Sequence, residues 1–233
     1  MTNIIDLESY CNAFFTAWQK NYGTKEYVLC KKACLDFIEE LIPIYAGRLY
    51  GEGEDQGTAY NFIYLFLMLA KGLENLISLV DLTKDKAWPQ SNERTESIWQ
   101  MLWDTKERLD VFKIHYLDQN FLAGIFEQLD KLEYCFYNIY GKGIYMSPVT
   151  LIRKAECSIC NINIKACDHI PGNLYDGRYC KEVIVDFELR GADFVESPYD
   201  MRCRVWPWNF IDQNHINVRI MNINVLDGFI HEK

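Results

Sequence analysis

Apolar residues recur every three or four positions through most of the first 140 residues, the spacing of one face of an α-helix. The first such run covers residues 7–18, and a second begins near Lys25. Pro43 should end or kink the second helix, because its ring clashes with the preceding turn. After a loop of glycines and acids over residues 51–57, a long apolar run over residues 60–80 predicts a third helix.

Two more helices are predicted from the same periodicity, over residues 98–112 and 122–139. Asp118 is a suitable N-cap for the last of them, and Gly141 a suitable stop at its C-terminal end. A polar linker over residues 83–92 precedes this pair of helices. The first part of the chain is therefore predicted to be a bundle of about five helices.

From about residue 145 the pattern changes to short runs in which apolar and polar residues alternate, as they do in strands with one buried face. Such runs lie at residues 182–189, 203–206 and 216–225. The sequence therefore predicts an α+β protein. A helical bundle over residues 1–144 would precede a small β-rich module over residues 145–233.

Composition narrows the class of protein. The chain has 233 residues, and its hydrophobic content of 49% indicates a folded protein. Its net charge of −9 argues against binding of nucleic acid through a general basic surface. Its N-terminus lacks the basic and apolar regions of a secretory signal, and nine cysteines without a regular framework suit the reducing cytoplasm. Charged residues interrupt the run over residues 60–80, which favours a buried helix over a membrane span.

The strongest chemical signal is a cluster of soft metal ligands. Cys157 and Cys160 are separated by two residues, so that one tight turn can present both sulfur atoms to a single ion. Cys167 and His169 follow, and Cys180 is an alternate ligand. Four protein ligands leave no open position for water, so the sequence predicts one structural Zn²⁺ that stabilises the β-rich module.

Two nuclease hypotheses compete with a purely structural site. Asp168 and His169 after a Cys-x2-Cys pair resemble the first part of an HNH nuclease motif, but the downstream residues of that motif are missing. Arg108 and His115, with six residues between them on a predicted helix, resemble the loose signature of HEPN ribonucleases. Such pairs are common on solvated helix faces, so the sequence favours a non-enzymatic protein.

An aromatic pair in the β-rich module suggests a docking surface. Trp206 and Trp208 flank a proline, and tryptophans often anchor interfaces between proteins. The alternative is that both cover the core of the module or its seam with the bundle.

The ligand cluster belongs to a longer pattern over residues 157–205. After the three cysteines and His169 come Gly172, Tyr175, Gly177 and Cys180. The pattern is similar to a zinc-finger-like segment of head-maturation proteases and scaffold proteins of some tailed phages, also found in uncharacterised bacterial proteins. This resemblance implies zinc held by the cysteines and histidine, a turn shaped by the glycines and tyrosine, and a phage, prophage or phage-defence setting. The resemblance does not extend to the catalytic residues of those proteases, so it does not imply protease activity.

These observations favour a cytoplasmic, non-enzymatic protein that interacts or assembles with another protein. Zinc would hold its C-terminal module in shape, and neither nucleic acid nor a membrane would be its partner. The alternative is a nuclease, acting through Arg108 and His115 in a HEPN-like bundle or through a degenerate HNH-like centre at His169.

Overall fold

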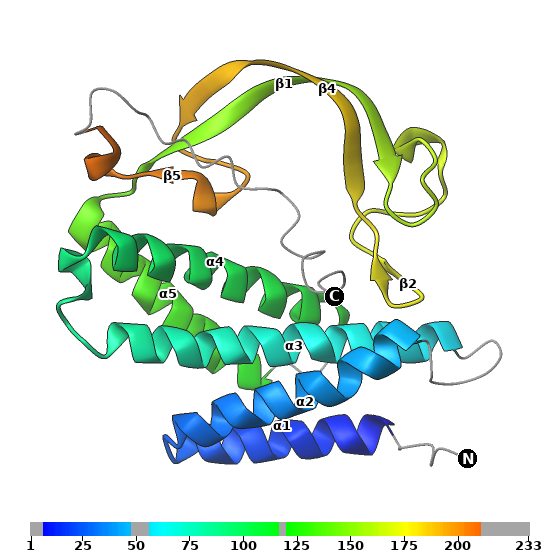
Figure 1. Cartoon of the computed structure of the whole chain (residues 1–233), viewed down its shortest axis with the longest axis vertical. Helices are drawn as coiled ribbons and strands as arrows, with labels where there is room; N and C mark the ends of the chain where they lie inside the picture. Colours follow the sequence, from blue (N-terminus) through cyan, green and yellow to red (C-terminus); the bar gives the residue numbers. More distant parts are fainter. Residues whose placement is uncertain (1–6, 48–55, 117–119, 211–233) are drawn as a thin grey trace. The chain divides into compact units, whose positions relative to one another are not determined.

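The computed structural model describes residues 7–47, 56–116 and 120–210, and within them it has five α-helices followed by five strands (Figure 1). The protein is α+β, as its sequence predicts. It forms two compact units that interleave along the chain. Of the described residues, those within 7–86, 104–126 and 174–178 belong to the helical unit, and those within 87–103, 127–173 and 179–210 to the strand unit.

Three helices make up most of the helical unit. Helix α1 spans Leu7–Gly23, α2 spans Tyr27–Gly47, and α3 spans Gln56–Thr83. Each buries the apolar stripe that its periodicity predicts. Pro43 lies inside α2, so of the two predicted effects the end of the helix is wrong, and a kink stays a prediction. Residues 51–55 of the predicted loop over residues 51–57 lie outside the described residues. Residues 56 and 57 are the first two of α3.

Helix α3 is the core element of the helical unit. Thirteen of its residues are buried, among them Ile63, Leu69, Leu73 and Ile77 with no exposed surface at all. Within the described parts of the chain it is the one helix long and apolar enough to cross a membrane, and 67% of its apolar window is buried inside the protein. This burial is what the core-helix interpretation of the run over residues 60–80 requires.

Helices α4, Asn92–His115, and α5, Asn120–Tyr140, contribute to both units. Gly141 ends α5 as predicted: its φ of +72° is in the left-handed region, and its N–H donates to the carbonyl of Tyr137 at 3.0 Å. The predicted N-cap Asp118 lies outside the described residues. A 3-10 turn over Trp88–Gln90 lies in the predicted polar linker.

A long antiparallel ribbon dominates the strand unit (Figure 1). Strand β1, Ile144–Cys157, pairs with β4, Glu182–Val195, from Tyr145 opposite Val195 to Cys157 opposite Glu182. The short strand β5, Arg204–Val205, pairs with the first two residues of β1, which gives the order β4-β1-β5. Strands β2, Leu174–Tyr175, and β3, Arg178–Tyr179, form a separate hairpin.

The structure extends one of the predicted strands and adds three that were not predicted, the long strand β1 and the short strands β2 and β3. The run over residues 182–189 continues to Val195, whereas only two residues of the run over 203–206 are in a strand. Strand β1 was not predicted, because Pro148 and three irregularities in its pairing with β4 disturb the alternation of apolar and polar residues. The predicted strand over residues 216–225 lies outside the described residues.

One face of the ribbon carries a group of three exposed apolar side chains, whereas the other carries both charged and apolar ones. Directly opposed residues of an antiparallel pair share a face, so Ile152 and Phe187 lie on one side, together with Leu189, two residues along β4. These three side chains are 46%, 56% and 56% exposed, and we call them the apolar ribbon face. On the opposite face, Glu188 forms ion pairs with Arg153 and Arg190 at 2.5 and 3.1 Å.

Arg204 joins β5 to the end of α5 inside the strand unit. Its guanidinium donates to the carbonyls of Tyr140, Gly141 and Lys142 at 3.2, 2.7 and 3.2 Å. It also lies over the rings of Trp99 and Trp206, at 4.9 and 4.8 Å from their centroids, and the residue is only 6% exposed. A buried cation therefore satisfies carbonyls at the C-terminal end of α5, where the helix dipole favours positive charge.

The turn of the β2–β3 hairpin packs within the helical unit. Asp176 and Gly177 both have positive φ, +50° and +74°, as a two-residue hairpin turn of the primed type requires. Tyr45 donates its hydroxyl to the carbonyl of Gly177 at 2.6 Å, and the N–H of Gly177 donates to Asn61 Oδ1 at 2.6 Å. The positive φ angles of Gly172, +94°, and of Gly177 confirm the prediction that these glycines shape turns.

We expect Gly177→Ala to destabilise the protein by about 2 kcal/mol, because a left-handed φ is strained for alanine. A Cβ atom at residue 177 would also come within 2.8 Å of the carbonyl oxygen of Tyr60. The matched control is Gly141→Ala, which has the same sign of φ but nothing within 4 Å of its Cβ position. Urea unfolding of both variants separates backbone strain from the clash; equal losses would show that the clash adds nothing.

Candidate metal centre

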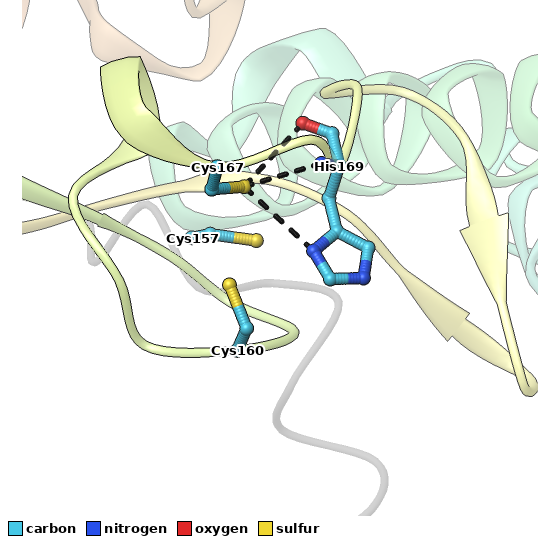
Figure 2. A group of neighbouring side chains, drawn as sticks. All are labelled: Cys157, Cys160, Cys167 and His169. Atoms are coloured by element: carbon cyan, nitrogen blue, oxygen red, sulfur yellow. Dashed lines mark hydrogen bonds between the residues drawn. The ribbon is translucent and has the colours of Figure 1, made fainter.

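Four side chains converge at one end of the ribbon. Figure 2 shows the sulfur atoms of Cys157, Cys160 and Cys167 and the ring of His169 directed toward one another. One ligand atom from each residue lies within 4.8 Å of all the others. In a tetrahedral site with metal–sulfur bonds of about 2.3 Å, neighbouring sulfur atoms are about 3.8 Å apart. The four donors are thus close to the spacing that a single ion needs.

The first two donors sit on a tight turn at the end of β1. The N–H of Asn161 donates to the carbonyl of Cys157 at 2.8 Å, and the positive φ of Asn161, +58°, lets the chain fold back. The N–H of Cys157 donates to the carbonyl of Ile162 at 2.8 Å, and the N–H of Ile159 donates to the Cys157 sulfur at 3.3 Å. This turn is what the two-residue spacing predicted.

The second pair follows a short 3-10 turn over Ile164–Ala166, which Asn163 caps through its side chain at 2.9 Å. The N–H of His169 donates to the Cys167 sulfur at 3.2 Å, and the same sulfur lies 3.7 Å from His169 Nδ1. The one-residue spacing therefore brings a thiol and an imidazole nitrogen to the same side of the loop.

Cys180 lies beside this cluster but is not one of its four members. It follows β3, is completely buried, and its sulfur is 3.7 Å from the sulfur of Cys157. Its backbone N–H donates to the carbonyl of Asn173, and its own carbonyl accepts from the N–H of Gly172, both at 2.8 Å. Cys180 therefore contacts one candidate ligand through its side chain and fixes the turn after His169 through its backbone.

The thiols of the cluster differ in acidity. Burial acts to raise the pKa of Cys157, but the backbone N–H groups of Cys160 and Ile159 and the neighbouring thiols bring it down to about 6. Burial raises the pKa of Cys167 to about 11 and that of Cys180 to about 12, and the nearby thiolate adds to both shifts. Cys157 is thus the most acidic of these three thiols. A bound cation would draw the protons from the other ligands.

The chemistry of this donor set is that of a closed site. Three sulfur donors and one imidazole can hold one soft or borderline divalent ion, and four protein ligands fill its tetrahedral coordination. A water molecule then has no position on the ion from which to attack a substrate. The geometry confirms that the four predicted residues lie together and could hold one metal ion.

Of the two tryptophans of the predicted docking surface, Trp206 is buried and Trp208 is partly exposed. Trp206 is 4% exposed, and its ring packs against those of Trp99, Phe136 and Tyr140. Trp208 stacks on Trp206 and donates its indole N–H to Glu96 at 2.6 Å. Both pack inside the strand unit against α4 and α5, as the second interpretation of this aromatic pair requires.

The nuclease alternatives gain no support. Arg108 is 5% exposed, so its guanidinium is not presented at the surface of α4, and His115 is partly buried near the end of the same helix. His169 lies among three thiols. As a metal ligand it would have no free lone pair with which to act as a general base.

Two features of the strand unit were not found from the sequence. The apolar ribbon face depends on the pairing of β1 with β4, and the sequence had no clear signal for β1. The buried Arg204 occupies a strand-like run in which an arginine ordinarily faces solvent. Gly143 is the one weak sign of this arrangement in the sequence. Its φ is +91°, and a Cβ atom there would come within 2.7 Å of the Arg204 guanidinium, so a glycine makes room for the arginine.

Comparisons with protein-family models, with curated proteins and with solved structures found no match to this chain. The fold and the site define an α+β protein with a Cys₃His cluster that could hold a metal ion. The resemblance of residues 157–205 to phage segments stays a prediction.

Proposed function

We propose that this is a non-enzymatic interaction protein whose β-ribbon is held in shape by one structural Zn²⁺. The observation that carries the proposal is the closed cluster of Cys157, Cys160, Cys167 and His169 at one end of the ribbon. Zinc suits this donor set, because thiolate and imidazole ligands in a tetrahedral arrangement match its softness and geometry.

The ribbon needs such support because its own core is small. Of the fourteen residues of β1, three are buried, and β4 has no buried residue. Isolated two-stranded ribbons are at best marginally stable in water. A metal ion that ties the turn at the end of β1 to the loop with His169 supplies the missing stability as binding free energy.

The surface proposed for interaction is the apolar ribbon face together with the outer edge of β4. Among the described residues, the outer edge of β4 pairs with no strand, and β1 pairs on its other side only at Ile144 and Tyr145. Unpaired edges bind extended segments through backbone hydrogen bonds, and alternate side chains of the segment then reach one face. The partner proposed here is an extended segment of another protein with apolar residues at alternate positions.

Replacing Phe187 by aspartate tests this surface. We expect Phe187→Asp to abolish capture of a partner by the tagged protein, because a charge would face the apolar side chains of the bound segment. Phe187 is 56% exposed, so the variant should keep its melting temperature and metal content. The matched control is Val28→Asp on α2, where the valine is 82% exposed.

The proposal is supported if the same partner binds the unmodified protein and Val28→Asp but not Phe187→Asp. Equal binding by all three proteins would rule out the apolar ribbon face. A dimer that forms with increasing concentration and dissociates on Phe187→Asp would identify a second copy of the chain as the occupant instead.

A further inference from the structure

A fifth potential ligand, the thiol of Cys180, lies beside the four-residue cluster, although a tetrahedral ion can bind only four donors. Four donors, Cys157, Cys160, Cys167 and His169, already lie within 4.8 Å of one another. The fifth, Cys180, has its sulfur 3.7 Å from that of Cys157, which is within hydrogen-bonding distance for two sulfur atoms. Both residues of this pair are completely buried, so water does not compete for the interaction.

The direction of this hydrogen bond follows from metal binding. A cysteine that coordinates a metal ion does so as thiolate, and a thiolate sulfur can only accept hydrogen bonds. With the ion bound to Cys157, the hydrogen between the two sulfurs must therefore belong to Cys180. The Cys157 sulfur would then accept two hydrogen bonds, one from Cys180 and one from the N–H of Ile159 at 3.3 Å.

The surrounding backbone holds Cys180 at this position. Glu182 is the residue opposite Cys157 in the β1–β4 pairing, and the N–H of Ser158 donates to the carbonyl of Lys181 at 3.0 Å. The N–H of Lys181 returns a bond to the Ser158 hydroxyl at 2.9 Å. The last residues of β1 and the residues before β4 are thus fastened on both sides of the pair of sulfurs.

We propose that Cys180 is a positioning residue of the metal centre: its thiol donates a hydrogen bond to the Cys157 thiolate and does not bind the ion. This inference rests on the proposed structural metal. A donor in this place spreads the negative charge of a partly buried three-thiolate site and fixes the direction of the Cys157 sulfur. Groups that orient metal ligands in this way contribute about 10–100-fold to metal affinity.

Two substitutions of Cys180 separate this role from its alternatives. Serine keeps a donor on the side chain but is a poor zinc ligand, whereas alanine removes the donor. We expect Cys180→Ser to bind zinc within about threefold of the unmodified protein, and Cys180→Ala to bind it about 10–100-fold more weakly, with one ion per chain in both. Competition with a chromophoric zinc chelator measures these affinities on the full chain.

Three other outcomes would overturn the proposal. If both variants lose zinc as completely as Cys157→Ser, then Cys180 is itself a ligand. If Cys180→Ala binds zinc as tightly as the unmodified protein, Cys180 merely fills space. Cys203→Ala, at a partly buried cysteine outside the cluster, controls for the loss of any thiol. If the unmodified protein and this control bind no zinc, the proposed metal centre fails as well, and the two failures are thereby distinguished.

Discussion

Cys157→Ser is expected to abolish stoichiometric metal binding and to unfold the turns around the cluster. The remaining three donors would leave the ion without a ligand at the end of β1, and a serine hydroxyl does not replace a thiolate for zinc. Binding free energies of structural zinc sites in small domains are about 10–16 kcal/mol, and this free energy is available only to the folded protein. The expected loss of folding free energy is therefore larger than that caused by most point substitutions.

Limited proteolysis followed by mass spectrometry checks this result. New cleavage should appear over residues 158–181, while the helices α1–α3 stay protected by their own buried core. Cys203→Ser is the control, because that cysteine lies outside the cluster. An unchanged cleavage pattern and melting temperature in Cys157→Ser would show that the cluster does not stabilise the fold.

Arg204→Ala should destabilise the protein by about 3 kcal/mol or more. The substitution removes charge-assisted hydrogen bonds to three carbonyls at the end of α5 and leaves these partly buried groups without their donor. It also removes the cation–π contacts with Trp99 and Trp206. Guanidinium chloride unfolding, followed by tryptophan fluorescence, measures the loss.

Two further arginine variants sharpen that measurement. Arg153→Ala removes an exposed ion pair with Glu188 and should cost less than about 1 kcal/mol. Arg204→Lys keeps the charge but not the planar fork, so its stability should fall between those of the unmodified protein and Arg204→Ala. If Arg204→Ala unfolds at the same denaturant concentration as Arg153→Ala, the guanidinium does not fasten β5 to α5.

The helices could be predicted because their information is local. Each has an apolar stripe at helical spacing, and α5 also has Gly141 at its end. Strand β1 could not, because its pairing with β4 is irregular at three places and its exposed positions carry apolar residues on both faces. A ribbon with little buried surface lacks the simple alternation that identifies a half-buried strand.

The four metal ligands could be predicted because all lie within thirteen positions of the chain, where spacing alone determines which side chains can meet. The place of Cys180 could not, since it depends on the pairing that sets Glu182 opposite Cys157. The same holds for Trp206. Its burial is provided by Trp99 and Phe136, more than sixty residues away in sequence, so the strand-like run alone could not show it.

The metal content of the protein tests the central claim most directly. The full chain, purified without added metal, is analysed by plasma emission spectroscopy and then melted with and without a strong chelator. The account predicts one zinc per chain and a large fall in melting temperature on chelation. Zinc well below one per chain, or zinc that is removed without any change in the melt, would contradict it.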